Sequence, residues 1–245
     1  MHERLLAPPT IHGVSDLWTV HLGRVPYEEA LALQHRVRAA RQAGAIPDTV
    51  LFLEHPPVYT RGRRTEAGEL PMGEDWYRAQ GIDVVTVDRG GKATYHGPGQ
   101  LVGYPIVRVD DVLGYVHRLE DAIVAALADE GVTARGRASE GREWTGAWVH
   151  DRKIASIGVH VSHGVTTHGL AVNVDNDLQP FEWIVPCGLH TPMTSVTREL
   201  RTGDHLPCFR KRMAHRLAEA LGARQRLVPL PRLERALAAA ATSVA

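Results

Sequence analysis

The chain has 245 residues, of which 44% are hydrophobic, and it carries 28 Lys and Arg residues against 28 Asp and Glu residues. A chain of this length and apolar content can bury one sizeable core, so we expect a single domain over residues 1–245. The balanced charge excludes a strong overall field, so neither nucleic acid nor a membrane is expected as a partner.

Further features bear on the cellular compartment. The N-terminal sequence MHERLLAPPTIHGVSD lacks the apolar segment of a signal peptide, and no stretch approaches the ~20 apolar residues of a membrane-spanning helix. The two cysteines are too few for a disulfide framework. We therefore expect a soluble, cytoplasmic protein in a reducing compartment.

The first half of the chain predicts several strands and one helix. Residues 17–23 alternate between apolar and polar side chains, which is typical of a strand. Pro26, with two glutamates in the following turn, predicts a helix start, and Gly44 marks the end of that helix. Apolar segments predict three more strands, at residues 49–55, 83–89 and 101–109.

The second half predicts three consecutive strands between helices. Apolar residues recur at helical spacing from Val112 to Leu127, and Gly131 closes that helix. Strands are expected at residues 144–150, 153–162 and 167–174, followed by a helix that Gly222 ends. The Ala-rich tail beyond Leu233 is expected to be a loosely attached helix. Because strands and helices mix without a βαβ rhythm, the predicted fold class is α+β.

Residues 89–100, RGGKATYHGPGQ, form the most unusual stretch, which we call the Gly-rich motif; it joins two expected strands. Its glycines permit positive φ and a close approach to the backbone. Arg89 and Lys92 supply cationic donors, and Tyr95 and His96 add an amphipathic wall. It is not a phosphate-binding loop, because neither GxxxxGK[ST] nor GxGxxG between a strand and a helix is present. The residue types indicate a binding loop, with an incidental glycine-rich hairpin as the alternative.

A reactive thiol is the second candidate for chemistry. Cys187 lies between a proline and a glycine, an accessible setting that suits a nucleophile. Cys208 begins an expected helix beside apolar residues, where burial is typical, although a helix N-terminus can also lower the pKa of a thiol. Local context favours Cys187, and either His96 or His190 could pair with a thiolate. The two histidines within residues 160–163 lack further ligands, so no metal site is predicted.

Residues 155–172 are predicted to form a β-hairpin with one face of small side chains. His163-Gly164 suits a two-residue turn. On the small face, this register pairs Gly158 with Gly169 and Ser156 with Ala171. On the largely apolar reverse face, it pairs Ala155 with Val172, Ile157 with Leu170 and Val159 with His168. The small face would accommodate either a packed helix or a slender ligand.

Four motifs together carry a resemblance. RGGKATYHGPGQLVGYP, KIASIG, THGLAVNV and PCGLH, in this order, resemble the lipoyl(octanoyl) transferase family, also called lipoate-protein ligase B. The likeness runs over about residues 51–221 and includes a charge-rich stretch at residues 135–143. It implies a biotin/lipoate ligase-like α+β catalytic core at about residues 46–227, with mixed sheets, flanking helices and an Ala-rich C-terminal tail.

The same resemblance implies a reaction and its partners. Cys187 would carry an octanoyl group as a thioester, taken from octanoyl-acyl carrier protein, and Lys153 would tune that thiol. The acyl group would pass to a lysine of the lipoyl domains of 2-oxoacid dehydrogenase complexes or of the glycine cleavage H protein, as the first step of endogenous protein lipoylation. Neither a cofactor nor a metal is implied. Regular alternation places Lys153 on the apolar face of its strand, so a bulge or an early strand start must redirect it.

The resemblance also implies the substrate contacts. They fall on Arg89, Gly90, Gly91, Lys92, Ala93, Thr94, Tyr95, His96, Ser156, Ile157, Gly158, Gly169, Leu170 and Ala171. The last six belong to the hairpin, so its small face is interpreted as a slot for the acyl chain. Gly158 and Gly169 would form the floor of this slot.

Two other functions are alternatives. An ATP-dependent lipoate or biotin ligase on the same fold would need adenylate-binding features and no cysteine nucleophile. A non-catalytic module that binds acyl carriers would tolerate any residue at Cys187. The basic run RGRR at residues 61–64 is a candidate for steering an acidic carrier protein, with a solvated loop as the alternative.

Overall fold

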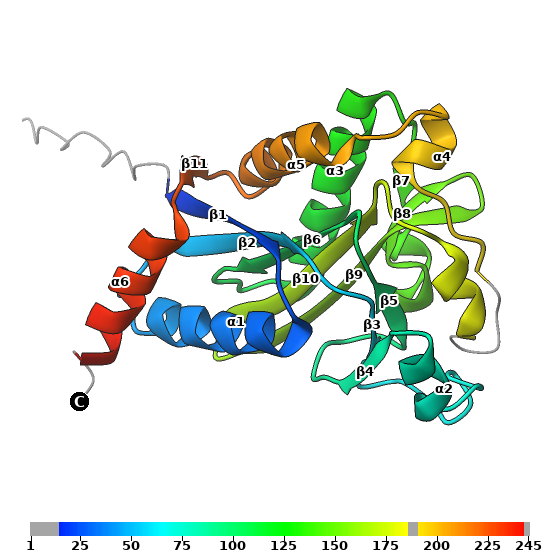
Figure 1. The fold of residues 1–245 in the computed structure, drawn as a ribbon. Helices are drawn as coiled ribbons and strands as arrows, with labels where there is room; N and C mark the ends of the chain where they lie inside the picture. The colour runs from blue at the N-terminus through cyan, green and yellow to red at the C-terminus, as the bar shows by residue number, and fades with distance from the viewer. Residues whose placement is uncertain (1–14, 186–190, 243–245) are drawn as a thin grey trace, which may run out of the picture.

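An eight-stranded mixed sheet forms the centre of the fold (Figure 1). The computed structural model describes residues 15–185 and 191–242. The strand order is β11-β1-β2-β6-β10-β9-β8-β7, with β1 parallel to both β2 and β11 and the remaining pairs antiparallel. The strands are β1 (Asp16–Arg24), β2 (Asp48–Glu54), β6 (Gln100–Ile106), β7 (Arg135–Gly136), β8 (Gly146–Val149), β9 (Arg152–Ser162), β10 (Val165–Asn173) and β11 (Arg224–Leu227).

Helices cover both faces of this sheet. α3 (Val112–Glu130) and α5 (Leu206–Ala220) pack on one face, and α1 (Tyr27–Gln42) and α6 (Leu230–Thr242) pack on the other (Figure 1). Strand β2 illustrates the two layers, because Phe52 points into the α3/α5 core while Leu51 points into the α1/α6 core. This arrangement confirms the predicted α+β class with mixed sheets and flanking helices.

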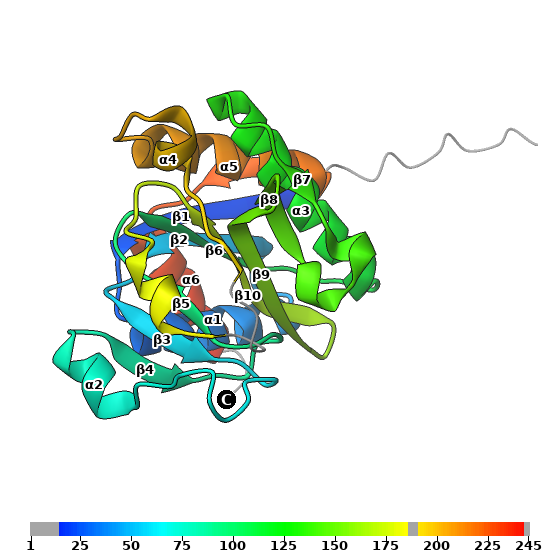
Figure 2. The ribbon, with the colours of Figure 1, turned by 90° about the vertical axis from the view of Figure 1, so that its right-hand side faces the viewer.

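A second, three-stranded sheet lies beside the large one (Figure 2). It consists of β4 (Asp83–Thr86), β3 (Val58–Arg61) and β5 (Thr94–His96), in that order. Helix α2 (Glu74–Ala79) and the 3-10 helix η3 (Gln179–Trp183) pack around it through aromatic side chains. The remaining elements are α4 (Val196–Leu200) and the 3-10 helices η1 (Ala138–Glu140) and η2 (Arg142–Trp144). Within the described ranges, no helix has both the length and the apolar character needed to cross a membrane.

The hairpin of β9 and β10 has the predicted register. Gly158 pairs with Gly169 and Ser156 pairs with Ala171, around the turn at His163-Gly164. The predicted side for His168 is wrong. This residue has φ +58°, and its ring contacts Tyr27 of α1, so it leaves the apolar face that contains its neighbour Leu170.

A β-bulge sets the direction of the Lys153 side chain. Along β8 and β9, Ala147 pairs with Ala155, but the next residue, Trp148, pairs with Lys153. Ile154 is therefore the extra residue, and its side chain is fully buried in the α3/α5 core. A bulge reverses the alternation beyond it, so Lys153 leaves the apolar face, as the sequence required.

The C-terminal helix is an integral part of the core, and the expectation of loose attachment is wrong. Leu233 and Leu237 of α6 are buried against residues of β1 and α1, and Glu234 forms an ion pair with Arg36 of α1. The Ala-rich composition permits this close packing because small side chains let the helix approach its neighbours.

The packing of α6 leads to a stability prediction. Leu233→Ala is expected to lower the free energy of unfolding by about 2–5 kcal/mol, because it leaves a cavity at a fully buried position. Leu230→Ala, on the same helix but 37% exposed, is the control and is expected to change stability far less. Urea unfolding of both variants measures the difference. Equal stabilities would mean that α6 is loosely attached after all.

Candidate functional site

The Gly-rich motif connects the two sheets. It leaves β4, contributes β5 to the small sheet, and enters β6 of the large sheet. Its first glycine, Gly90, donates its backbone N–H to the Val159 carbonyl of β9 at 3.0 Å. On the other side, the N–H groups of Arg63 and Arg64 donate to the carbonyls of Arg89 and Gly91 at 3.0 and 3.1 Å. The motif is thus held between β9 and the basic loop that follows β3.

Arg89 is a buried cation within this motif. Its guanidinium donates to the carbonyl and hydroxyl oxygens of Thr60, both at 2.7 Å, and to the Gly90 carbonyl at 3.1 Å. Among the described residues, no carboxylate accepts a hydrogen bond from it. Burial lowers the pKa of the Arg89 guanidinium, and the Glu69 carboxylate acts against that shift from a distance. A buried guanidinium held by neutral oxygens retains much of its attraction for an electron-rich ligand atom.

The small face of the hairpin is filled by protein backbone at both glycines. A Cβ on Gly158 would lie 2.8 Å from the carbonyl oxygen of Gly90. A Cβ on Gly169 would lie 2.5 Å from Pro105 Cδ of β6 and would also overlap the Gly103 carbonyl. The prediction of an open slot between these glycines is therefore wrong, because a neighbouring chain segment occupies the space where each side chain would lie. The role of the hairpin residues in substrate binding stays a prediction.

A hydrogen-bond chain runs from the motif to the segment that follows residue 190. The amide nitrogen of Gln100 donates to the Tyr95 carbonyl and to Asn173 Oδ1 at 3.2 and 3.0 Å, so Gln100 Oε1 must accept from His96 Nδ1 at 2.7 Å. Asn173 in turn donates to the Thr194 carbonyl at 3.1 Å. Burial lowers the pKa of His96 well below its ordinary range. His96 is therefore neutral, with its lone pair on Nε2.

Lys153 pairs with the same segment through its backbone. Its N–H donates to the Pro192 carbonyl at 2.8 Å, and its carbonyl accepts from Thr194 N–H at 3.0 Å. Burial lowers the pKa of the Lys153 amine to about 8, against the opposing charge of Glu120. Near pH 8 both protonation states are populated. Lys153 can therefore act as a cation toward a thiolate or as a neutral proton acceptor.

The predicted nucleophile, Cys187, lies outside the described residues, as does His190. The chain on the N-terminal side of that gap is anchored to α2 and to the loop before it, because Tyr77 Oη of α2 donates to the Trp183 carbonyl at 2.8 Å and Val185 N–H donates to the Glu69 carbonyl at 2.9 Å. The chain on the C-terminal side is anchored to Lys153. In sequence, Cys187 lies between these two anchors.

The remaining sequence candidates lie elsewhere. Cys208 is exposed in the first turn of α5, so its predicted burial is wrong. His160 Nε2 lies 3.6 Å from Asp88 Oδ2, and in residues 15–185 and 191–242 no three His, Cys, Asp or Glu side chains are grouped to hold a metal. Sequence reasoning missed Gln100 and Asn173, although both lie inside the quoted motifs, because isolated amides carry no recognisable spacing.

Comparison with known proteins identifies the family. The family model of the lipoyl protein ligase A/B catalytic domain matches residues 26–218. The chain belongs to this family. Similar members include the octanoyltransferase of Acidothermus cellulolyticus, 48% identical over 206 residues that cover 82% of this chain and 90% of that protein. The octanoyltransferase of Thermobifida fusca is 43% identical over 225 residues, which cover 86% and 92%. The resemblance inferred from the four motifs is thereby confirmed.

Solved structures that are named as lipoate protein ligases share the fold. The putative lipoate protein ligase Ta0514 of T. acidophilum with bound lipoic acid matches with a TM-score of 0.71 and 19% identity, covering 91% of this chain and 93% of that chain. Lipoate-protein ligase A bound with ATP matches with a TM-score of 0.72 and 19% identity, covering 91% and 92%. The lipoate ligase-like fold is therefore confirmed.

The backbone contact at Gly169 can be tested by stability. Gly169→Ala is expected to lower the free energy of unfolding by about 1–3 kcal/mol, because its methyl group would overlap β6. Ser156→Ala, on the same face, is the control, since Ser156 is only partly buried and is replaced by a smaller side chain. Urea unfolding compares the two. A Gly169→Ala protein as stable as the control would restore the open slot.

Proposed function

We propose that this protein transfers an octanoyl group from octanoyl-acyl carrier protein to a lysine of lipoyl domains, through a thioester on Cys187. The names of its relatives and the family membership support octanoyl transfer. The observation that carries the cysteine route is the backbone pairing of Lys153 with Pro192 and Thr194, five and seven residues after Cys187 in the sequence. That pairing ties the lysine of the KIASIG motif to the chain that leaves the PCGLH motif.

The first half-reaction forms the acyl-enzyme. The Cys187 thiolate attacks the thioester carbonyl of the donor, the new carbon–sulfur bond forms, and the thiol of the carrier's phosphopantetheine arm leaves after taking up a proton. One thioester replaces another, so the step is close to balanced in free energy. A Lys153 ammonium near the thiol would favour the thiolate by charge.

The second half-reaction transfers the acyl group to nitrogen. The ε-amine of a lipoyl-domain lysine attacks the acyl-enzyme, an amide forms, and Cys187 leaves as a thiolate. An amide is more stable than a thioester, so the step runs downhill without ATP. A neutral Lys153 can accept the proton that the attacking amine must lose, and a pKa of about 8 suits that exchange.

The proposed substrate contacts remain those of the Gly-rich motif and the hairpin. Two side chains of the Gly-rich motif offer polar contacts to the substrate. Arg89 offers its buried guanidinium, and His96 offers the lone pair on Nε2. The proposed acceptors are the lipoyl domains of 2-oxoacid dehydrogenase complexes and the glycine cleavage H protein. An ATP-dependent lipoate ligase is the second candidate, because the fold is shared with a ligase that binds ATP.

One experiment separates these functions. The protein is incubated with octanoyl-acyl carrier protein without ATP, and the intact mass is measured. Wild type and Cys208→Ser are expected to gain one octanoyl group, whereas Cys187→Ser is expected to gain none, since a serine without a strong base does not replace a thiolate at neutral pH.

The outcomes are distinct. Loss of the adduct in Cys208→Ser with retention in Cys187→Ser would reverse the assignment of the nucleophile. Amide formation on a lipoyl domain only when ATP is added would favour the ligase.

The basic loop after β3 supports a carrier-docking prediction. Arg61 pairs with Glu74 at 2.5 Å, but Arg63 and Arg64 are exposed and hydrogen-bond through their backbone to the Gly-rich motif. Arg63→Gln with Arg64→Gln is expected to slow transfer from the acidic carrier protein several-fold at low salt, because steering by charge is lost. Transfer from a small octanoyl thioester is expected to stay unchanged.

The control for this prediction is Arg235→Gln, which removes an exposed charge from α6 on the other side of the molecule. Rates are measured across a series of salt concentrations, since exposed charges are screened at high salt. A double variant that slows both donors equally would contradict docking by these arginines.

A further inference from the structure

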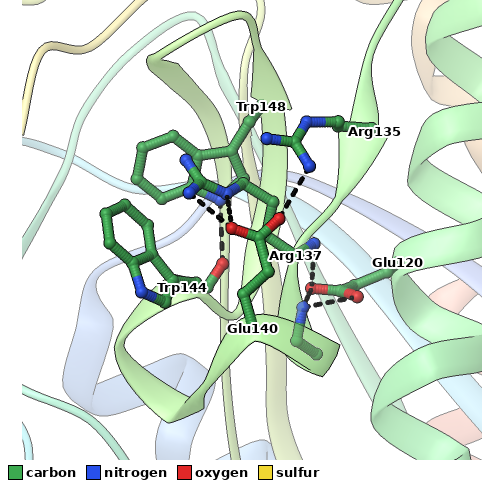
Figure 3. A network of polar contacts seen from close by, with 7 residues as sticks. Glu120, Arg135, Arg137, Glu140, Trp144 and Trp148 are labelled. Atoms are coloured by element: carbon green, nitrogen blue, oxygen red, sulfur yellow. Dashed lines mark hydrogen bonds and ion pairs between the residues drawn. The ribbon is translucent and has the colours of Figure 1, made fainter.

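Glu120 is a buried carboxylate on α3 that fastens the strand next to Lys153. Its side chain is 4% exposed and accepts hydrogen bonds from the backbone N–H groups of Gly146 at 2.7 Å and Ala138 at 3.0 Å. It also accepts from the backbone N–H of Arg137 at 3.3 Å (Figure 3). It lies at helical spacing with the apolar residues Val116 and Ile123, so the buried face of α3 contains it. Three backbone donors satisfy the carboxylate but leave its charge in place.

The segment that Glu120 holds is the charge-rich stretch noted in the sequence. The guanidinium of Arg137 lies 3.9 Å from the centre of the Trp144 ring and 4.8 Å from that of Trp148 (Figure 3). Glu140 accepts from Arg137 at 2.6 and 2.8 Å, and Trp148 Nε1 donates to the Trp144 carbonyl at 2.8 Å. These contacts fix the Trp148 ring on β8, and Glu140 neutralises Arg137.

The Lys153 side chain crosses this fixed surface. A Cβ on Gly146 would lie 2.9 Å from Lys153 Cε and would also overlap the Ala155 carbonyl. Lys153 Nζ lies 5.3 Å from the centre of the Trp148 ring. The lysine therefore passes directly over the glycine whose N–H group is bonded to Glu120.

The other charged side chains on the neighbouring elements have partners of their own. Arg152, next in sequence, forms an ion pair with Glu199 at 3.0 Å, and Arg137 is bound to Glu140. His117 Nδ1 lies 3.9 Å from Glu120 Oε2 on the same helix. The Glu120 charge raises the pKa of the Lys153 amine, against the larger and opposite effect of burial.

We propose that Glu120 is a positioning residue for Lys153 in the acyl transfer, holding Gly146 beneath the lysine side chain and supplying the counter-charge of its ammonium form. This inference rests on the proposed function, in which Lys153 changes protonation state between the two half-reactions. Burial favours the neutral amine and the carboxylate favours the ammonium.

The sign of the effect follows from the charge. Removing the carboxylate disfavours the ammonium, so the pKa of Lys153 falls further below its ordinary range. The neutral amine then appears at lower pH. Glu120→Gln keeps an amide oxygen for the Gly146 N–H and removes the charge, which makes it the informative variant.

The experiment measures the protonation of Lys153 without requiring catalysis. Wild type and Glu120→Gln are labelled briefly with acetic anhydride over a pH series, and the extent of acetylation at Lys153 is read by mass spectrometry of its peptide. The midpoint of reactivity in Glu120→Gln is expected about one pH unit lower than in wild type. Glu130→Gln, which removes another carboxylate of α3 paired with Arg212, is the control and is expected to leave the midpoint unchanged.

The pH profile of octanoyl transfer provides the second measurement. The pH at which the transfer rate rises is expected to be lower in Glu120→Gln than in wild type, as for the labelling midpoint. An unchanged labelling midpoint would overturn the inference. If the labelling midpoint shifts in Glu120→Gln but the wild-type protein forms no acyl-enzyme, the proposed function is wrong and the electrostatic link between Glu120 and Lys153 is supported.

A third variant covers the case in which Glu120→Gln does not fold. Glu120→Asp keeps the charge but shortens the side chain, so the hydrogen bond to Gly146 is lost. It is expected to retain the wild-type labelling midpoint and to lower the transfer rate. A wild-type rate in this variant would overturn the positioning role.

Discussion

The bulge at Ile154 is the constraint on which the candidate site depends. Without the extra residue, the alternation of β9 would direct Lys153 into the apolar core under α3 and α5. The bulge keeps Ile154 in that core and turns Lys153 across Gly146 toward Trp148. On the other edge of β9, the pairing with β10 ends at Ala155, and the Lys153 backbone pairs with Pro192 and Thr194 instead.

The site is built from buried charges whose partners are mostly neutral backbone groups. Arg89 is held by oxygens of Thr60 and Gly90, and Glu120 is held by three N–H groups. Hydrogen bonds of this kind satisfy an ion while leaving its field in place. Lys153 lies within reach of the field of Glu120, so its protonation depends on packing as well as on pH. This is the balance that an amine needs if it is to exchange a proton near neutrality.

Glycines serve close packing around the site. Gly158 admits the backbone of the Gly-rich motif, Gly169 admits β6, and Gly146 admits Lys153. In each place a side chain would push apart two packed segments, which at Gly158 and Gly169 are distant in sequence. The small sheet adds a second anchor, since Tyr59 of β3 donates to the Pro180 carbonyl at 2.6 Å, in the chain that leads to Val185. These contacts hold the motif, the hairpin and the described chain on both sides of Cys187 relative to one another.

The sequence by itself determined the elements that rest on local periodicity. Start and stop residues predicted α1, and helical spacing predicted α3 and α5. Alternation and apolar segments predicted the strands of the large sheet from β1 to β10, except the two-residue β7. A two-residue turn predicted the register of the β9–β10 hairpin. The order of four motifs also determined the family. The need for a bulge near Lys153 was itself visible in the alternation.

Only the tertiary structure decided what depends on contacts between distant segments. The positive φ of His168 and the burial of α6 against β1 reflect neighbours more than about thirty residues away in the chain. The exposure of Cys208 reflects the absence of such neighbours among the described residues. Glu120 also depends on tertiary contacts, because its backbone donors lie 17 to 26 residues further along the chain, on a segment that folds back against α3. Periodicity records which face of an element is apolar, but the partner of a single polar atom is set by the way the whole chain closes on itself.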